Sequence, residues 1–425
     1  MVEDDDGAGA PDTPDEDAVE ATPLLEPAEG VPPLSVSVND IAEAAEKLAA
    51  GHGPFAIDAE RASGFRYSNR AYLIQIRRTG AGTVLIDPVN HGSSPIDVLK
   101  PVAEVLAEDE WILHAADQDL PCLAEVGLHP PALYDTELAG RLAGFERVNL
   151  AAMVQRLLGL GLAKGHGAAD WSKRPLPDAW LNYAALDVEV LITLREEIAA
   201  ILAQQDKSAW AAEEFEYLRC AEPQTTRRDR WRRTSGIHKV RSRQGLAAVR
   251  ELWTVRDQIA RSRDIAPGRI LPDSAIIAAA TADPKTVEDL TKLPIFGGSK
   301  QRRSAHVWLG ALEAARTNPE PPDTGDQQNG PPPAVRWAKR KPEAAARLDA
   351  ARAALAELSA RVGVPTENLV SPELIRRLCW DWQGDRQEDR ETAIDEFLRD
   401  GGARSWQRQL AVPVLAAALT PAPST

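Results

Sequence analysis

Residues 55–78 read FAIDAERASGFRYSNRAYLIQIRR, and this stretch decides how the first half of the chain folds. Its apolar start at 55–57 and its second apolar segment at 71–78 predict two strands, joined by a polar region that contains glycine. Residues two apart on a strand point to the same face. We therefore expect Asp58 and Glu60 side by side at the end of a buried strand, where the two anions need a proton, a basic partner or a bound cation. Mg²⁺ prefers oxygen ligands of this kind, although an Asp-x-Glu pair alone more often marks a solvated loop.

Length and charge bound the possibilities. The chain has 425 residues, enough for about two to four domains. Residues 1–30 hold eleven acidic side chains and no basic one, and they carry most of the formal net charge of −15. The rest of the chain is therefore close to neutral, which does not argue against a polyanionic substrate. We expect residues 1–35 to form a disordered acidic tail.

The cysteines and the hydropathy pattern indicate the compartment. Cys122, Cys220 and Cys379 lie far apart, match no zinc-binding spacing, and are odd in number, which argues against a disulfide framework. The sequence shows no signal peptide and no apolar run of membrane-spanning length. We expect a soluble, cytoplasmic protein with no membrane partner.

The order of predicted elements indicates a mixed α/β sheet. A helix at about 39–50 precedes the two strands of the opening stretch, and a third strand follows at 83–86. A helix at 96–107, a strand at 111–113 and a short strand near 133–134 come next. The region 149–203 is helical, with breaks near 159–167 and 174–177.

The composition changes after residue 215. Residues 216–243 form a basic connector, with nine Lys and Arg residues between Arg219 and Arg243. Two all-helical blocks follow, at 244–316 and 336–421, separated by a proline-rich linker at 317–335. Each block has a long helix and a loop that leads to a further apolar helix, so we interpret the pair as a degenerate duplication of one module.

Two further acidic positions stand out. Asp119 follows the strand at 111–113, and Asp187 lies four residues after Tyr183 on a helix, so these two share a face. Each has an ordinary explanation: Asp117 is a candidate helix N-cap, Asp119 would favour the helix dipole, and a Tyr-x-x-x-Asp pair usually marks an amphipathic surface. Taken together, however, Asp58, Glu60, Asp119 and Asp187 supply the four carboxylates that a two-metal site needs.

In these motifs the chain resembles ribonuclease D-type enzymes of the DEDD exonuclease superfamily, in the branch whose last motif carries tyrosine. The first motif is matched by residues 57–60, the second by residues 114–120 with its ligand at Asp119, and the third by NYAALDV around Tyr183 and Asp187. Residues 167–176 resemble the segment just before the third motif. The resemblance spans about residues 38–205, and it departs from the family at Ala59, often Thr there and not a ligand. Residues 245–316 resemble the helicase-and-ribonuclease-D C-terminal (HRDC) domain, and residues 336–419 a more divergent copy.

The resemblance implies an α/β ribonuclease-H-like exonuclease domain at 36–215, with a mixed sheet flanked by helices, followed by two small all-α HRDC-like domains. It also implies 3′→5′ hydrolysis of RNA to nucleoside 5′-monophosphates, with two divalent metal ions, Mg²⁺ or Mn²⁺. Asp58 would bind both metals, the other three carboxylates would complete their shells, and Tyr183 would orient the attacking water. Because a phenol has an unperturbed pKa near 10, it is a poor base at neutral pH, so the metal must activate the water.

The expected substrate is single-stranded or 3′-overhanging RNA, for which tRNA precursors are one candidate. We expect nucleic-acid contacts from Gln75, His114, Arg232, Arg233, Lys300 and Arg302. The basic run at 219–243 fits phosphate binding and a solvated connector equally well. Two alternatives stay open: a DNA exonuclease on the same core, and a nucleic-acid-binding protein whose catalytic site has decayed. A protein interaction scaffold fits less well, since it would not need this set of acids, and the sequence does not determine the oligomeric state.

Overall fold

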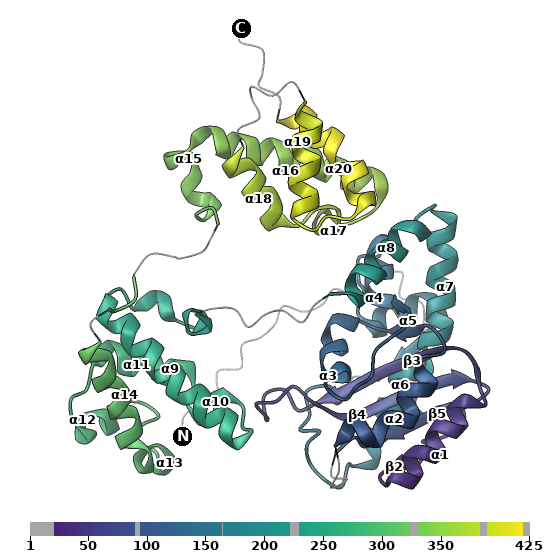
Figure 1. The fold of residues 1–425 in the computed structure, drawn as a ribbon, viewed down its shortest axis with the longest axis horizontal. Helices are drawn as coiled ribbons and strands as arrows, with labels where there is room; N and C mark the ends of the chain where they lie inside the picture. The colour runs from purple at the N-terminus through teal and green to yellow at the C-terminus, as the bar shows by residue number, and fades with distance from the viewer. Residues whose placement is uncertain are drawn as a thin grey trace.

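The computed structural model describes residues 21–89, 94–163, 165–221, 229–318, 320–323, 330–382 and 389–419. Figure 1 shows an α/β domain with a central sheet and two separate helical domains. In the described residues, no helix is both long enough and apolar enough to span a membrane.

A six-stranded sheet forms the centre of the α/β domain. Its strand order is β2-β5-β4-β3-β6-β7, in which β4 runs antiparallel to β3 and β5 while the other neighbours are parallel. The predicted mixed sheet is therefore confirmed. The strands are β2 (Leu34–Ser35), β3 (His52–Arg61), β4 (Ala71–Thr79), β5 (Gly82–Ile86), β6 (Trp111–Leu113) and β7 (Leu133–Asp135).

The alternation of side chains along β3 and β4 separates two layers. On one face, Ile57, Ile74 and Ile76 pack with α1 (Val38–Ala49) and α2 (Pro95–Leu106). On the other face, Leu73 packs with residues of α6 (Asp178–Glu189). The side chains of Asp58 and Glu60 point to this second face of the sheet, which α6 covers.

Further helices complete the domain: α3 (Leu120–Glu125), α4 (Thr136–Leu142), α5 (Leu150–Leu158), α7 (Leu191–Gln204) and α8 (Ser208–Arg219). Most predicted elements lie within a few residues of these bounds. α1 begins slightly earlier than predicted because the Ser37 side chain caps it, accepting a hydrogen bond from the amide of Asp40.

The prediction that residues 1–35 form a disordered tail is wrong for its last part, which contains two short strands. β1 (Thr22–Leu24) pairs in parallel with β8 (Leu160–Leu162), a strand within the predicted break at 159–167, and β2 pairs with β5. The backbone groups of these residues find ladder partners, and Leu24 packs at the edge of the main core. Residues 1–20 lie outside the described residues.

The first helical domain contains α9 (Arg243–Arg263), α10 (Pro267–Ile270), α11 (Asp273–Ala282), α12 (Val287–Lys292), α13 (Ser299–Arg303) and α14 (Ala305–Thr317). Part of the predicted connector belongs to this domain. Trp231 is 4% exposed and lies in the same core as Leu252 and Trp308, so the residues around it are not a solvated linker. Burial of the indole ring accounts for the difference, because it removes a large apolar surface from water.

The second helical domain contains α15 (Trp337–Arg340), α16 (Pro342–Val362), α17 (Thr366–Leu369), α18 (Pro372–Asp381), α19 (Arg390–Asp400) and α20 (Ser405–Ala418). Helices α16, α17 and α18 have 21, 4 and 10 residues, as do α9, α10 and α11. This repeat of lengths supports the proposed duplication.

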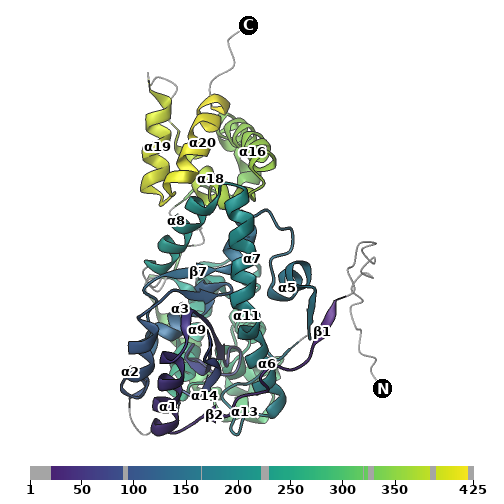
Figure 2. The same cartoon turned by 90° about the vertical axis from the view of Figure 1, so that its right-hand side faces the viewer.

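The two helical domains contact the α/β domain at different places. The first docks on the loop between β3 and β4: Asp264 accepts a hydrogen bond from the Ser68 amide at 2.8 Å, and Arg269 donates to the Gly64 carbonyl at 2.7 Å. The second packs against α8, where both views place it (Figures 1 and 2). There Glu214 accepts two hydrogen bonds of 2.7 Å from the Arg404 guanidinium.

Candidate active site

The first two candidate ligands lie on β3 just beyond its pairing with β6, where β3 is still paired with β4. Asp58 is directly opposite Gln75 in the antiparallel ladder, so both side chains point to the same face. The Gln75 amide donates a hydrogen bond of 2.8 Å to Oδ2 of Asp58. Glu60, two residues further along β3, is 6% exposed on the same face.

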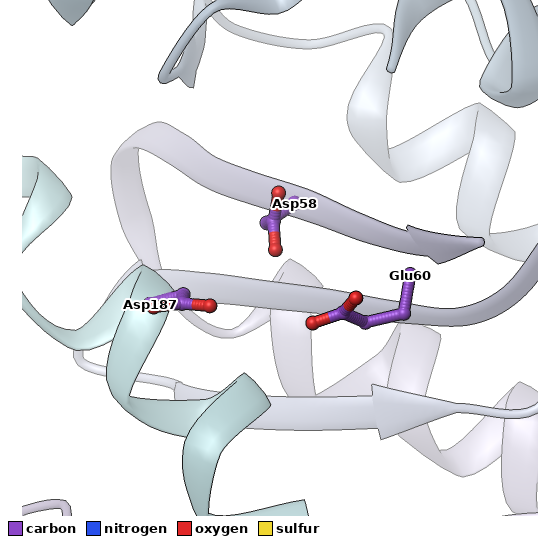
Figure 3. A group of neighbouring side chains, drawn as sticks. All are labelled: Asp58, Glu60 and Asp187. Carbon is purple, nitrogen blue, oxygen red and sulfur yellow. The ribbon is translucent and has the colours of Figure 1, made fainter. Parts of the chain in front are cut away.

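Helix α6 brings the third carboxylate to this pair. An oxygen of Asp187 lies within 4.8 Å of oxygens from Asp58 and Glu60. In Figure 3 the three carboxylates converge on one space between β3 and α6. Tyr183 lies one turn earlier on α6, on the same face as Asp187, and lines the same cleft.

Asp119 reaches the cluster from the turn after β6. Asp135, at the end of β7, accepts hydrogen bonds from the amides of Ala115 and Ala116 and so fixes this turn. Asp119 is 4% exposed, and burial followed by the nearby charge of Asp58 raises the pKa of its carboxyl group. The N-cap considered for Asp117 is not found, because Ala115 precedes the short helix η1 (Ala116–Gln118).

A single cleft of about 440 Å³ joins these side chains. Besides the carboxylates, it is lined by backbone and side-chain atoms of β3, of the turn after β6, of α5 and of the segment before α6. All five residues predicted for catalysis lie along it: Asp58, Glu60, Asp119, Tyr183 and Asp187.

The electrostatics of the cluster are those of anions held together in a poorly solvated space. Burial and the charges of Asp58 and Asp187 raise the pKa of Glu60 to about 10. Burial, followed by repulsion from Asp58, also raises the pKa of both Asp119 and Asp187 well above the usual range. The four acids cannot all ionise near neutral pH unless positive charge is supplied.

These residues fit a divalent metal ion. Every donor in the cluster is a carboxylate oxygen, the ligand type that Mg²⁺ and Mn²⁺ prefer. A bound cation would also remove the repulsion that raises the pKa values of these acids. The cluster therefore has suitable ligands for a metal ion and negative charge that such an ion would neutralise.

Tyr183 has no means of acting as a base by itself. Burial raises the pKa of its hydroxyl, and the neighbouring charges of Asp187 and Glu60 raise it further. The phenol therefore stays protonated near neutral pH, and its OH group can donate or accept a hydrogen bond in the cleft.

The residues expected to contact nucleic acid are dispersed. His114 lines the cleft, whereas Gln75 is fully buried beneath Asp58, so its expected direct contact is corrected to support of that carboxylate. Lys300 donates to the Arg269 carbonyl in the first helical domain. Arg232 in the same domain donates to the Asp323 carbonyl. Arg233 and Arg302 are exposed there, and none of these four lines the catalytic cleft.

Two residues of the cleft were missed at the level of sequence. Arg61 directly follows the first motif, lies 3.2 Å from Oδ1 of Asp119 and donates to the Gln118 carbonyl at 2.7 Å. Its position in the sequence, directly after the acid pair Asp58 and Glu60, could have indicated this role for Arg61. Gly165 contacts the ring of Tyr183 so closely that a methyl group there would clash, and no sequence pattern indicates this contact.

Comparisons with known proteins match three segments of the chain. The family described as 3′-5′ exonuclease matches residues 34–203, the HRDC domain matches residues 245–312, and the 3′ to 5′ exonuclease C-terminal domain matches residues 330–419. A ribonuclease D from Shewanella is 30% identical over 281 residues, which cover 65% of this chain and 69% of that protein. The chain belongs to the ribonuclease D family.

Another ribonuclease D relative aligns over less of its length. This protein, from Jannaschia, is 33% identical over 246 residues, 56% of this chain and 62% of its own, so the match spans less than two thirds of that relative. Among solved structures, a protein from Bifidobacterium adolescentis superposes with a TM-score of 0.84 and 36% identity, covering 94% of this chain and all of that one. The crystal structure of Escherichia coli RNase D superposes with a TM-score of 0.67 at 24% identity, covering 91% and 98% of the two chains, which confirms the fold.

Proposed function

We propose that this protein is a metal-dependent 3′→5′ exoribonuclease that removes nucleoside 5′-monophosphates from RNA 3′ ends. The observation that carries the proposal is the convergence of Asp58, Glu60, Asp119 and Asp187 with Tyr183 in one cleft, in a chain of the ribonuclease D family. The ribonuclease D relatives support RNA as the substrate class, and single-stranded or 3′-overhanging RNA, including tRNA precursors, is the proposed form. A cytoplasmic location stays a prediction.

The four carboxylates would hold two divalent ions, Mg²⁺ or Mn²⁺. Asp58 would contact both, because its carboxylate lies within 4.8 Å of those of Glu60 and Asp187 and shares the cleft with Asp119. When bound, such ions lower the pKa of a coordinated water and stabilise the leaving oxygen. Gln75 fixes the orientation of Asp58 through its 2.8 Å hydrogen bond.

Tyr183 would orient the attacking water through its hydroxyl group, since it lines the cleft beside Asp187. Because its pKa is raised, Tyr183 stays protonated near neutral pH and no phenolate is present to take a proton from the water. Its contribution is then to position the water. Arg61 supplies a positive charge beside Asp119 at the edge of the same cleft, where it can offset negative charge.

The test uses purified protein with 5′-labelled single-stranded RNA and DNA of the same sequence, in Mg²⁺, Mn²⁺ or EDTA. A stepwise ladder on RNA that EDTA abolishes is the expected result. Faster degradation of DNA would favour the DNA exonuclease, and tight binding without cleavage would favour a decayed site.

Two substitutions make the test specific to the cluster. Asp58→Ala is expected to abolish hydrolysis while the melting temperature in EDTA is maintained, since removal of one anion relieves repulsion. The matched control is Asp117→Ala, which removes an exposed acid two residues from Asp119 and should retain activity. Normal turnover by Asp58→Ala would refute the assignment.

A further inference from the structure

His114 is held in a defined orientation at the edge of the cleft. His114 directly follows β6, in which Ile112 pairs with Ala56 of β3. It lines the same cleft as Asp58 and the other carboxylates.

The hydrogen bonds of Thr136 assign the tautomer of the imidazole ring. Nδ1 of His114 lies 2.9 Å from Oγ1 of Thr136, and this hydroxyl donates its only proton to the Leu113 carbonyl at 3.2 Å. Thr136 can then only accept from His114, so the proton of the neutral ring is on Nδ1. Burial lowers the pKa of His114 to about 4, so the ring is neutral at neutral pH.

The other ring nitrogen, Nε2, is consequently a bare acceptor. Among the described residues it has no hydrogen-bond partner, and it is not one of the buried polar atoms that lack one, so it is accessible to solvent. An acceptor at this place repels phosphate oxygens, which are also acceptors. It requires a donor from the substrate, such as a sugar hydroxyl.

We propose that Nε2 of His114 accepts a hydrogen bond from the 2′-hydroxyl of the 3′-terminal ribose, which makes His114 the residue that distinguishes RNA from DNA. The inference rests on the proposed function, because removal of a 3′-terminal nucleotide places its phosphate at the carboxylates and its ribose next to them. The 2′-hydroxyl is the group that differs between the two nucleic acids.

The test compares two oligonucleotides, one entirely of RNA and one that is identical except for a 2′-deoxynucleotide at its 3′ end. For the wild type we expect kcat/KM for the first removal to be about 2- to 10-fold higher on the all-RNA substrate, which corresponds to one hydrogen bond. In His114→Ala the ratio should fall to about one, because the all-RNA rate decreases and the deoxy rate does not.

Two further variants separate substrate recognition from a structural effect. His114→Gln places an amide oxygen near the position of Nε2 and should restore part of the preference. His129→Ala removes an exposed histidine outside the cleft and should leave the ratio unchanged. A nitrogen-15 histidine spectrum, in which His114→Gln identifies the signal, should show Nδ1 protonated and Nε2 not.

The outcomes are distinct. A ratio that His114→Ala leaves unchanged, or rates that fall equally on both substrates, would overturn this proposal while the exoribonuclease assignment stands. Equal losses would indicate a contact with the 3′-hydroxyl or a positioning role. A wild type that cleaves neither oligonucleotide would overturn the proposed function itself.

Discussion

Gly165 provides the space that the Tyr183 ring occupies. A Cβ atom built on Gly165 would lie 1.8 and 1.9 Å from two ring carbons. Carbon atoms in contact are normally about 3.5–4.0 Å apart. In Gly165→Ala the separation must therefore increase by close to 2 Å, and we expect the ring to move because α6 fixes only its backbone.

A displacement of this size has a large expected effect on rate. Misplacement of a catalytic group by about 1 Å can cost about 10²-fold, so kcat for RNA should fall by about two orders of magnitude. Because Tyr183 supplies no carboxylate to the proposed metal site, Mn²⁺ affinity measured by calorimetry should change far less than kcat.

The same loop offers a matched control. A Cβ on Gly167 would lie 3.5 Å from the Tyr183 hydroxyl, an ordinary contact, so Gly167→Ala should retain most of the activity. Single-turnover kinetics measure both variants under the same conditions. If Gly165→Ala cleaves RNA at the wild-type rate, the loop yields instead of the ring, and the reasoning that Gly165 positions Tyr183 is wrong.

Three further substitutions test charge and docking. The pKa of Glu60 in the folded protein is raised to about 10, so the folded state becomes less stable as the pH rises above the pKa that Glu60 has in the unfolded chain. In EDTA, Glu60→Gln should therefore raise the free energy of unfolding by about 1–3 kcal/mol at pH 8 and have little effect at pH 4. Denaturant titration at the two pH values measures this difference. Asp264→Asn weakens the charge-assisted bond to the Ser68 amide, and hydrogen exchange of that amide should be about tenfold faster. Glu214→Ala leaves Arg404 without its carboxylate and should cost about 3 kcal/mol in thermal or denaturant unfolding; an unchanged transition would show that the second helical domain is held by packing alone.

The sequence was sufficient to predict that the five proposed catalytic residues meet in one cleft, because each of them lies in a local motif. Asp58 and Glu60 have the two-residue spacing of a strand, and Tyr183 and Asp187 the four-residue spacing of a helix. The mixed sheet followed from the order of apolar segments. The spacing within each motif determines which face of its strand or helix a side chain occupies. The family resemblance then indicated that the three motifs form one site.

The role of Gln75 shows where local patterns end. It depends on the register of β4 against β3, and a slip of one residue would turn the side chain away from Asp58. The pairing of β1 with β8 joins segments that are distant in the chain and only three residues long, too short for a periodic signal. Trp231 likewise lies in a strongly basic segment, and only its tertiary contacts show that it is part of the helical core.

The loop between β3 and β4 connects substrate-facing and helical parts of the molecule. It begins after Arg61, the last residue of β3, and Arg269 and Asp264 of the first helical domain bind it at Gly64 and Ser68. A movement of that domain therefore acts on the end of β3. Asp58, however, is fixed by the ladder to β4 and by Gln75, so such a movement should decay along β3 before reaching it. We accordingly expect Asp264→Asn to change exchange in the loop far more than kcat on a dinucleotide, which is too short to reach the helical domain.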